Sequence, residues 1–261
     1  MDWIEALILG IIQGLTEFLP VSSSGHLELG KHILGVEYTE NLTFTVVVHG
    51  ATVLSTIIIF WKTIVELFKD FFKFQWNDST KYIAKILVSM IPVIIIGLLF
   101  KDQIEGLFTG NILFVGCMLI ITSGLLAFTY YAKERQSDIS FKSSFIIGFA
   151  QALAVIPGIS RSGATIATGL YLGNKKESIA KFSFLMVLAP IIAANVKDLL
   201  EFNFSAQNSV SITPLVVGFL AAFFSGLLAC SWMLKIVKRG KLIYFAIYCF
   251  IVGSIAVIVS F

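Results

Sequence analysis

Gln13 and Glu17 are the first residues of this chain that could support chemistry at membrane depth. They lie four residues apart and therefore on one face of a helix, just before the run Ser22-Ser23-Ser24-Gly25-His26. An ionised carboxylate in such an apolar stretch costs roughly 2.5–3.5 kcal/mol, so Glu17 should face a polar cavity and a partner. The alternative is that Glu17 only pairs structurally, with a helix end or with Arg161.

A second segment, residues 157–165, has the same character. It places Ser160, Ser162 and Thr165 around a single Arg161, after a Pro-Gly turn. In both segments a Ser- and Gly-rich turn opens a helix, and free N–H groups at a helix start bind anions. The guanidinium of Arg161 presents a rigid fork of donors suited to phosphate oxygens.

The two segments together predict phosphoryl transfer. They supply an oxyanion cradle from two helix starts, one permanent cation, a carboxylate able to hold a divalent metal, candidate hydroxyl nucleophiles and a nearby imidazole. The alternative is that the Ser and Gly residues serve only close helix packing, which would leave Arg161, Glu17 and His26 unexplained. His49 is close enough in principle to line the same cavity, but we expect it to bond to a neighbouring helix, outside the site.

An internal repeat positions these segments. A shift of 138 residues places residues 10–35 on residues 148–173 without a gap, and the matches include Gln13 with Gln151 and Ser22 with Ser160. We therefore predict a single membrane domain, 1–261, with a first repeat at 1–135 and a second at 140–261. Each repeat begins with a broken helix hairpin, 5–35 or 143–173, and continues with three spans.

The amino-acid composition indicates that the protein is surrounded mostly by membrane lipid. Hydrophobic residues make up 57% of the 261 residues, charged residues 13%, and the mean hydropathy is +0.91. Such a chain is not a soluble domain, and we expect no nucleic-acid partner. Apolar runs at 44–61, 83–100, 112–131, 182–197, 213–234 and 242–260 predict about six spanning helices. The stretch 61–76 reads as an interfacial anchor helix.

The hairpin limbs, near 5–19 and 25–34, are too short to span, which favours re-entrant geometry. This topology gathers the basic residues on one face: Lys62, Lys69, Lys73, Lys81, Lys85, Lys133, Arg135, Lys142, Lys175, Lys176, Lys181, Lys235, Lys238, Arg239 and Lys241. Lys31, Lys101 and Lys197 remain on the other face. The predicted fold is an all-α integral membrane protein with an inverted-topology repeat, in which the first hairpin enters from outside and the second from the cytoplasm.

The strings at 13–26 and 157–165 strongly resemble the undecaprenyl-diphosphatase family, also called bacitracin resistance proteins, and the likeness extends over essentially the whole chain. The resemblance implies a bacterial cell-membrane enzyme. Its activity would be the hydrolysis of undecaprenyl diphosphate to undecaprenyl phosphate and phosphate, which recycles the lipid carrier of peptidoglycan synthesis and confers resistance to bacitracin. It also implies a divalent cation, Mg²⁺ or Ca²⁺.

The family's functional positions fall on Gln13, Glu17, Ser23, His26, Ser160, Arg161 and Thr165. Gln13 stands where relatives carry Glu or Gln, so metal binding would rest on Glu17 and the substrate phosphates. We expect the diphosphate to be bound by Arg161 and by the following side chains: Gln13, Ser22, Ser24, Ser160, Ser162 and Thr165. Ser23 would attack the terminal phosphorus while His26 manages protons, or water would attack directly, oriented by His26 or Glu17.

The competing function is lipid transport, because inverted repeats with broken helices are a transporter architecture and a flippase needs a similar cradle. A second phosphatase superfamily also uses Ser-Gly-His and Ser-Arg strings, but it needs a His downstream, and this chain has none after His49. The sequence leaves three points open: whether the protein forms a homodimer, whether it flips its product, and which side the substrate enters from. The charge distribution favours a site that opens to the outer face.

Overall fold

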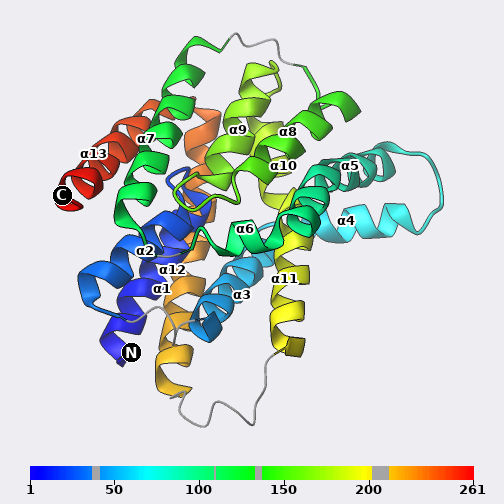
Figure 1. Cartoon of the computed structure of the whole chain (residues 1–261). Helices are drawn as coiled ribbons and strands as arrows, with labels where there is room; N and C mark the ends of the chain where they lie inside the picture. Colours follow the sequence, from blue (N-terminus) through cyan, green and yellow to red (C-terminus); the bar gives the residue numbers. More distant parts are fainter. Residues whose placement is uncertain (37–41, 109, 133–136, 202–211) are drawn as a thin grey trace.

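The computed structural model describes residues 1–36, 42–108, 110–132, 137–201 and 212–261, and within these ranges the regular structure is helical (Figure 1). The first half contains α1 (Trp3–Phe18), α2 (Ser23–Leu34), α3 (Leu42–Ile59), α4 (Trp61–Phe71), α5 (Asp78–Leu99), α6 (Lys101–Glu105) and α7 (Ile112–Phe128). The second half contains α8 (Phe141–Leu153), α9 (Arg161–Tyr171), α10 (Lys176–Met186), α11 (Leu188–Glu201), α12 (Ile212–Lys238) and α13 (Ile243–Val259).

The first hairpin is α1 and α2, joined by a short turn at residues 19–22. Asp2 begins α1 in a capping box with Glu5, which satisfies backbone donors at the helix start. Ser22 caps the start of α2: its hydroxyl accepts from the N–H of Gly25 at 3.3 Å, and its φ of 72° lies in the left-handed region. The chain therefore reverses sharply where the Ser-rich string begins.

The second hairpin, α8 and α9, repeats this design. Ser140 caps α8, and Ser160 caps α9 by accepting from the N–H of Gly163 at 3.0 Å. Gly158 in the turn has a φ of 93°, and a Cβ there would lie 2.7 Å from the carbonyl oxygen of Val115 on α7. Only glycine fits this backbone so close to another helix.

Small residues allow the long helices to approach both hairpins closely. A Cβ on Gly10 of α1 would lie 2.5 Å from the carbonyl oxygen of Gly218 on α12, and one on Gly148 of α8 would lie 2.1 Å from that of Ser89 on α5. Helices α7 and α13 meet at Gly116 and Gly253, where each added Cβ would lie within 3 Å of the other glycine's carbonyl oxygen. These contacts fix the hairpins against the bundle.

Three helices are long and apolar enough to cross a membrane among the described residues: α5, α7 together with its 3₁₀ extension to Tyr131, and α12. Helix α13 is apolar but shorter. Helices α3 and α4 form a further candidate pair bent by 74°, and α4 has no buried residue. Its exposed aromatic side chains include Trp61 and Phe68, which fits the expected anchor helix.

The predicted span at 182–197 is not a single continuous helix. The structure divides it into α10 and α11, which break at Val187. Pro190 accounts for the break, because a proline has no N–H to bond the carbonyl of Met186 four residues earlier and its ring crowds that carbonyl. The break places Ser183, at the end of α10, close to the second hairpin.

Candidate active site

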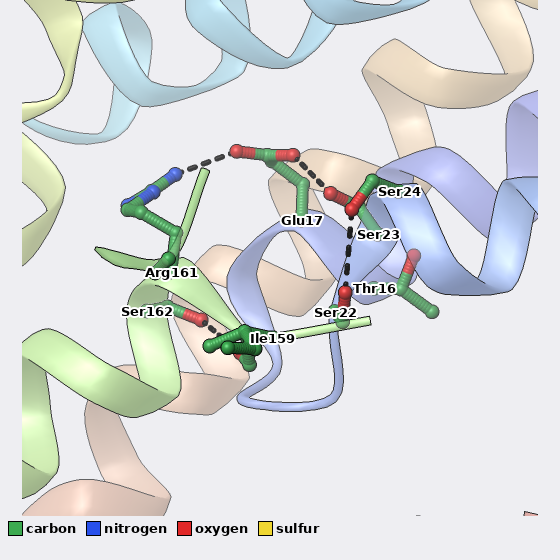
Figure 2. A pocket seen from close by; sticks show the side chains of 10 residues that line it. Thr16, Glu17, Ser22, Ser23, Ser24, Ile159, Arg161 and Ser162 are labelled. Atoms are coloured by element: carbon green, nitrogen blue, oxygen red, sulfur yellow. Dashed lines mark hydrogen bonds and ion pairs between the residues drawn. The ribbon is translucent and has the colours of Figure 1, made fainter. Parts of the chain in front are cut away.

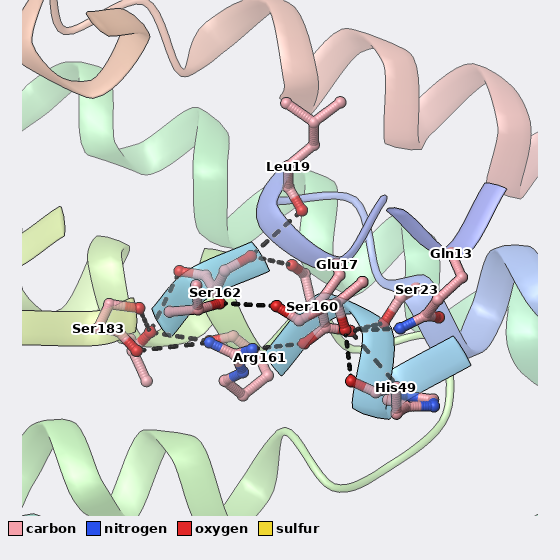
Figure 3. Close-up of polar contacts among 12 residues, drawn as sticks. Gln13, Glu17, Leu19, Ser23, His49, Ser160, Arg161, Ser162 and Ser183 are labelled. Atoms are coloured by element: carbon pink, nitrogen blue, oxygen red, sulfur yellow. Dashed lines mark hydrogen bonds and ion pairs between the residues drawn. The ribbon is translucent and has the colours of Figure 1, made fainter. Parts of the chain in front are cut away.

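A buried ion pair joins the two hairpins. The Oε1 atom of Glu17, near the end of α1, lies 2.6 Å from Nη2 of Arg161, the first residue of α9. The two side chains are only 8% and 17% exposed, and Figure 3 shows them facing each other across the turns. The sequence left open that Glu17 only pairs structurally with Arg161. This pair is present, and it lies inside the predicted site rather than apart from it.

The second carboxylate oxygen of Glu17 collects further polar contacts. The Ser23 hydroxyl donates to Oε2 at 2.7 Å, and Nε2 of Gln13 donates to it at 3.1 Å. Nε2 of His49 on α3 lies 4.0 Å from the same oxygen. His49 bonds through Nδ1 to the Thr45 carbonyl of its own helix, so our expectation that it lies outside the site, bonded to a neighbouring helix, is wrong.

Gln13 has an unused acceptor. Its side chain is fully buried, and its Oε1 atom has no hydrogen-bond partner among the described residues. Its Nε2 is already engaged by Glu17, which orients the amide. A buried carbonyl oxygen without a donor is costly, and this one lies on the helix face that carries the site carboxylate. Such an oxygen can accept from a ligand or hold a hard cation.

Hydroxyl groups tie the second turn to α7 and to the first turn. Thr122 on α7 accepts from the N–H of Ser160 and donates to the carbonyl of Gly158, each at 3.0 Å. The hydroxyl of Ser162 donates to the carbonyl of Leu19 at 3.2 Å, which links the second turn to the first. The Ser160 and Ser162 hydroxyls lie 3.4 Å apart.

Thr165 lies behind Arg161 rather than at the pocket. Its hydroxyl donates to the Arg161 carbonyl at 2.9 Å and lies 2.6 Å from the hydroxyl of Ser183 on α10. Nη1 of Arg161 also donates to the Ser183 carbonyl, at 3.4 Å. Sequence reasoning missed Ser183, because a lone serine in an apolar helix carries no signal of its own.

The two turns enclose a polar pocket (Figure 2). It is lined by Thr16, Glu17, Ser22, Ser23, Ser24, Ala154, Ile159, Ser160, Arg161 and Ser162. Among the described residues, the backbone N–H groups of Ser23, Ser24, Arg161 and Ser162 have no acceptor, since the capping hydroxyls serve the next residues along each helix. Two helix starts with free N–H groups and one guanidinium make this pocket suited to an anion with several oxygens.

His26 faces away from this pocket. Its Nδ1 lies 2.9 Å from the Ser22 carbonyl, and its Nε2 lies 2.9 Å from the hydroxyl of Tyr248 on α13, on which the ring also stacks. His26 is 9% exposed and is absent from the pocket lining. The structure thus brings the other predicted site residues together around the pocket or directly behind it. His26 is the exception among them, because both of its ring nitrogens are engaged by Ser22 and Tyr248.

No cluster of three or more His, Cys, Asp or Glu residues that could hold a metal occurs in the described ranges. Glu17 is the single carboxylate among the residues that line this pocket, so a cation bound there would rely otherwise on neutral oxygens. That oxygen-only set suits Mg²⁺ or Ca²⁺ rather than a transition metal, provided that a ligand supplies further oxygens.

Comparison with known proteins is consistent with these observations. Residues 6–255 match the family described as "Bacitracin resistance protein BacA". A relative from Bacteroides fragilis named undecaprenyl-diphosphatase is 56% identical over 263 residues, covering 100% of this chain and 99% of the relative. Relatives of the same name from Parabacteroides distasonis (56% over 260 residues, 98% of each chain) and Methanosphaera stadtmanae (38% over 281 residues, 100% and 99%) are also similar.

Proposed function

The chain belongs to the bacitracin resistance protein BacA family, and we propose that its buried pocket hydrolyses undecaprenyl diphosphate to undecaprenyl phosphate and inorganic phosphate. It is a multi-pass membrane protein, which fits a substrate that is itself a lipid. The observation that carries the proposal is the Glu17–Arg161 pair at a pocket between two helix starts. In this role the enzyme recycles the lipid carrier for peptidoglycan synthesis and removes the diphosphate that bacitracin binds.

Substrate binding begins with Arg161. One of its terminal nitrogens engages Glu17 and the other reaches a backbone carbonyl, so the guanidinium is held as a planar donor at the start of α9. The free N–H groups of both helix starts and the hydroxyls of Ser22, Ser24, Ser160 and Ser162 complete the cradle for the diphosphate. Because these donors are already in place, they stabilise charge on the transferred phosphoryl group without reorganisation.

The nucleophile of the proposed reaction is Ser23. Its hydroxyl donates to Oε2 of Glu17, which is therefore positioned to accept the proton as Oγ forms a bond to the terminal phosphorus. The bond from that phosphorus to the bridging oxygen breaks, and undecaprenyl phosphate leaves with the bridging oxygen. Water then cleaves the Ser23 phosphoester, releases phosphate and restores the hydroxyl. The alternative is direct attack by water with Glu17 as the base.

His26 has a positioning role in this proposal. Its ring ties the carbonyl of Ser22 to the hydroxyl of Tyr248, and this holds the start of α2 against α13. The Ser-rich turn is thereby fixed in its left-handed conformation. The direct contact of Ser23 is with Glu17, so the proton transfer is assigned to the carboxylate.

We assign Glu17 and the unpartnered Oε1 of Gln13 as protein ligands for Mg²⁺ or Ca²⁺, with the substrate phosphates as further ligands. A bound divalent cation would neutralise charge on the phosphate oxygens. Gln13 is neutral, so binding of the cation should depend strongly on the substrate.

The membrane arrangement in this proposal is an inverted repeat with about six spans and two re-entrant hairpins, divided at 1–135 and 140–261. The contact of Gly116 with Gly253 supports this arrangement. The separation of the two residues in sequence is close to the repeat shift, and they face each other as equivalent residues near a twofold axis do. The pairing of α1 with α12 and of α5 with α8 supports it further. We place the basic loops in the cytoplasm and the opening of the site on the outer face of the bacterial cell membrane. Lys133 and Arg135 lie outside the described residues.

The test is phosphate release from undecaprenyl diphosphate by detergent-purified protein, with Mg²⁺ or Ca²⁺ and with EDTA. We expect metal-dependent release by the wild type and losses of about 10²–10³-fold or more in Glu17→Gln and Arg161→Ala. Arg239→Ala, an exposed arginine outside the pocket, is the control and should retain wild-type activity. Folded wild type that releases no phosphate would exclude the hydrolase and favour lipid transport through the same cradle.

A further inference from the structure

An apolar groove lies beside the polar pocket. It has a volume of about 510 Å³ and is lined mainly by apolar side chains of α1, the turn that follows α1, α12 and α13: Leu15, Leu19, Trp232, Ile236, Tyr244 and Phe245 are among them. Its size falls within the range of sites that bind small molecules. Trp232 and Tyr244 are 55% and 63% exposed, so described neighbours leave much of their aromatic surface uncovered.

The groove and the pocket share a wall. Thr16 lines both, and it precedes Glu17 directly in α1. Val21, which lines the groove, is followed by Ser22, which lines the pocket. The apolar space therefore starts where the phosphate-binding space ends, on the opposite side of a single turn of chain.

The lining distinguishes the groove from an ordinary lipid-facing surface. Helices in a bilayer present convex apolar faces that neighbouring lipids cover without a fixed geometry. Here three helices form a concave surface with aromatic side chains, and Tyr248 at its edge also donates or accepts a hydrogen bond with His26. An apolar ligand that carries a charged head at one end fits this arrangement.

We propose that this groove binds the first isoprene units of the substrate's polyprenyl chain while the diphosphate occupies the pocket. The inference rests on the proposed function and adds to it the binding surface that selects a long-chain lipid. Branched, unsaturated isoprene units offer broad apolar contact to aromatic rings such as those of Trp232 and Tyr244. The rest of the polyprenyl chain would pass from the groove into the surrounding lipid.

The experiment compares two substrates on each variant of the full chain: undecaprenyl diphosphate and a diphosphate carrying a single prenyl unit. Trp232→Ala removes a groove wall, and Ile236→Trp fills the groove. We expect each to lower the ratio of kcat/KM for the long substrate to that for the short one by about tenfold, the scale on which apolar pockets discriminate. Phe224→Ala is the matched control, an aromatic residue of α12 that is 59% exposed and outside the groove, and it should keep the wild-type ratio. An unchanged ratio in both groove variants would overturn the proposal.

A binding measurement separates this inference from the hydrolase itself. A polyprenyl monophosphate with a photoreactive group on its first isoprene unit should label α12 and α13 between residues 232 and 248, whether or not the protein turns over diphosphates. Labelling that concentrates on helices other than α1, α12 and α13 would refute the groove. Labelling at 232–248 in a protein that releases no phosphate would support the groove and reject the hydrolase.

Discussion

The two carboxylate oxygens of Glu17 have different partners, so in the proposed reaction this residue would serve both structure and chemistry. Oε1 faces the permanent charge of Arg161, while Oε2 faces the hydroxyl of Ser23 and the amide of Gln13. Removing one partner of a buried pair leaves the other charge uncompensated, at a cost of about 3–5 kcal/mol. Variants of this pair must therefore be checked for folding before a loss of activity is assigned to chemistry.

Substitution of Ser23 tests whether the reaction passes through a covalent phosphoserine intermediate. Ser23→Ala removes the hydroxyl that contacts Glu17, and we expect turnover to fall on the order of thousandfold or more if this oxygen attacks phosphorus. Rapid-quench experiments with substrate labelled in the terminal phosphate should trap label on the wild-type protein and none on the variant. Ser225→Ala is the matched control, since that hydroxyl bonds to its own helix in α12. Substantial turnover by Ser23→Ala without trapped label would favour direct attack by water.

Thr165 tests how Arg161 is held in place. Thr165→Val keeps the shape of the side chain but removes the hydroxyl that joins the Arg161 carbonyl to Ser183, and it leaves the buried Ser183 oxygen without that partner. Since one such hydrogen bond is worth about 1 kcal/mol, KM should rise about fivefold with a smaller change in kcat. Thr168→Val, one turn along α9, is the control and should leave both constants near those of wild type. Equal effects of the two variants would contradict the positioning role.

At the scale of elements, two prolines in apolar segments have different effects on helix continuity. Pro190 coincides with the break between α10 and α11, whereas Pro92 lies inside the continuous α5. The break at Val187 has a consequence for the site, because α10 ends just after Ser183 and so meets α9 behind Arg161. A straight span over 182–197 would continue past the site without ending there.

The close contact of α8 with α5 depends on the absence of a side chain at Gly148. Gly148→Ala would place a Cβ 2.1 Å from the Ser89 carbonyl oxygen, so the helices must separate, and we expect a loss of about 1–3 kcal/mol of stability. Gly124→Ala is the matched control, because no atom lies within 4 Å of a Cβ at that helical position. It should leave the Tm unchanged or raise it through helix propensity. Thermal unfolding in one detergent measures both, and an equal Tm for the two variants would refute the close packing.

At the scale of the whole molecule, the proposed inverted arrangement requires the α6 loop and the turn between α12 and α13 to lie on opposite sides of the membrane. We test this in a chain whose three cysteines are replaced by alanine, with Gln103→Cys or Arg239→Cys added; both positions are exposed. A membrane-impermeant maleimide should label Gln103→Cys in intact spheroplasts but should label Arg239→Cys only after permeabilisation. Labelling of both cysteines from the same side would contradict the topology.

The sequence alone determined the class of fold and the two strings that form the pocket. Hydropathy, helix capping by Ser22 and Ser160, and the breaks at the two turns all act within a few residues, so they can be predicted from neighbours in the chain. The same local rules identified Glu17 and Arg161 as charged groups that need partners in an apolar setting.

Only the tertiary structure decided which groups meet. Glu17 and Arg161 are 144 residues apart in sequence, and their contact depends on how the two hairpins pack against α12 and α5. The same packing brought His49 to the carboxylate and turned His26 toward Tyr248. These contacts depend on distances between helices across the bundle. Side-chain volumes and glycine contacts on other helices set those distances, so a local sequence pattern cannot predict them.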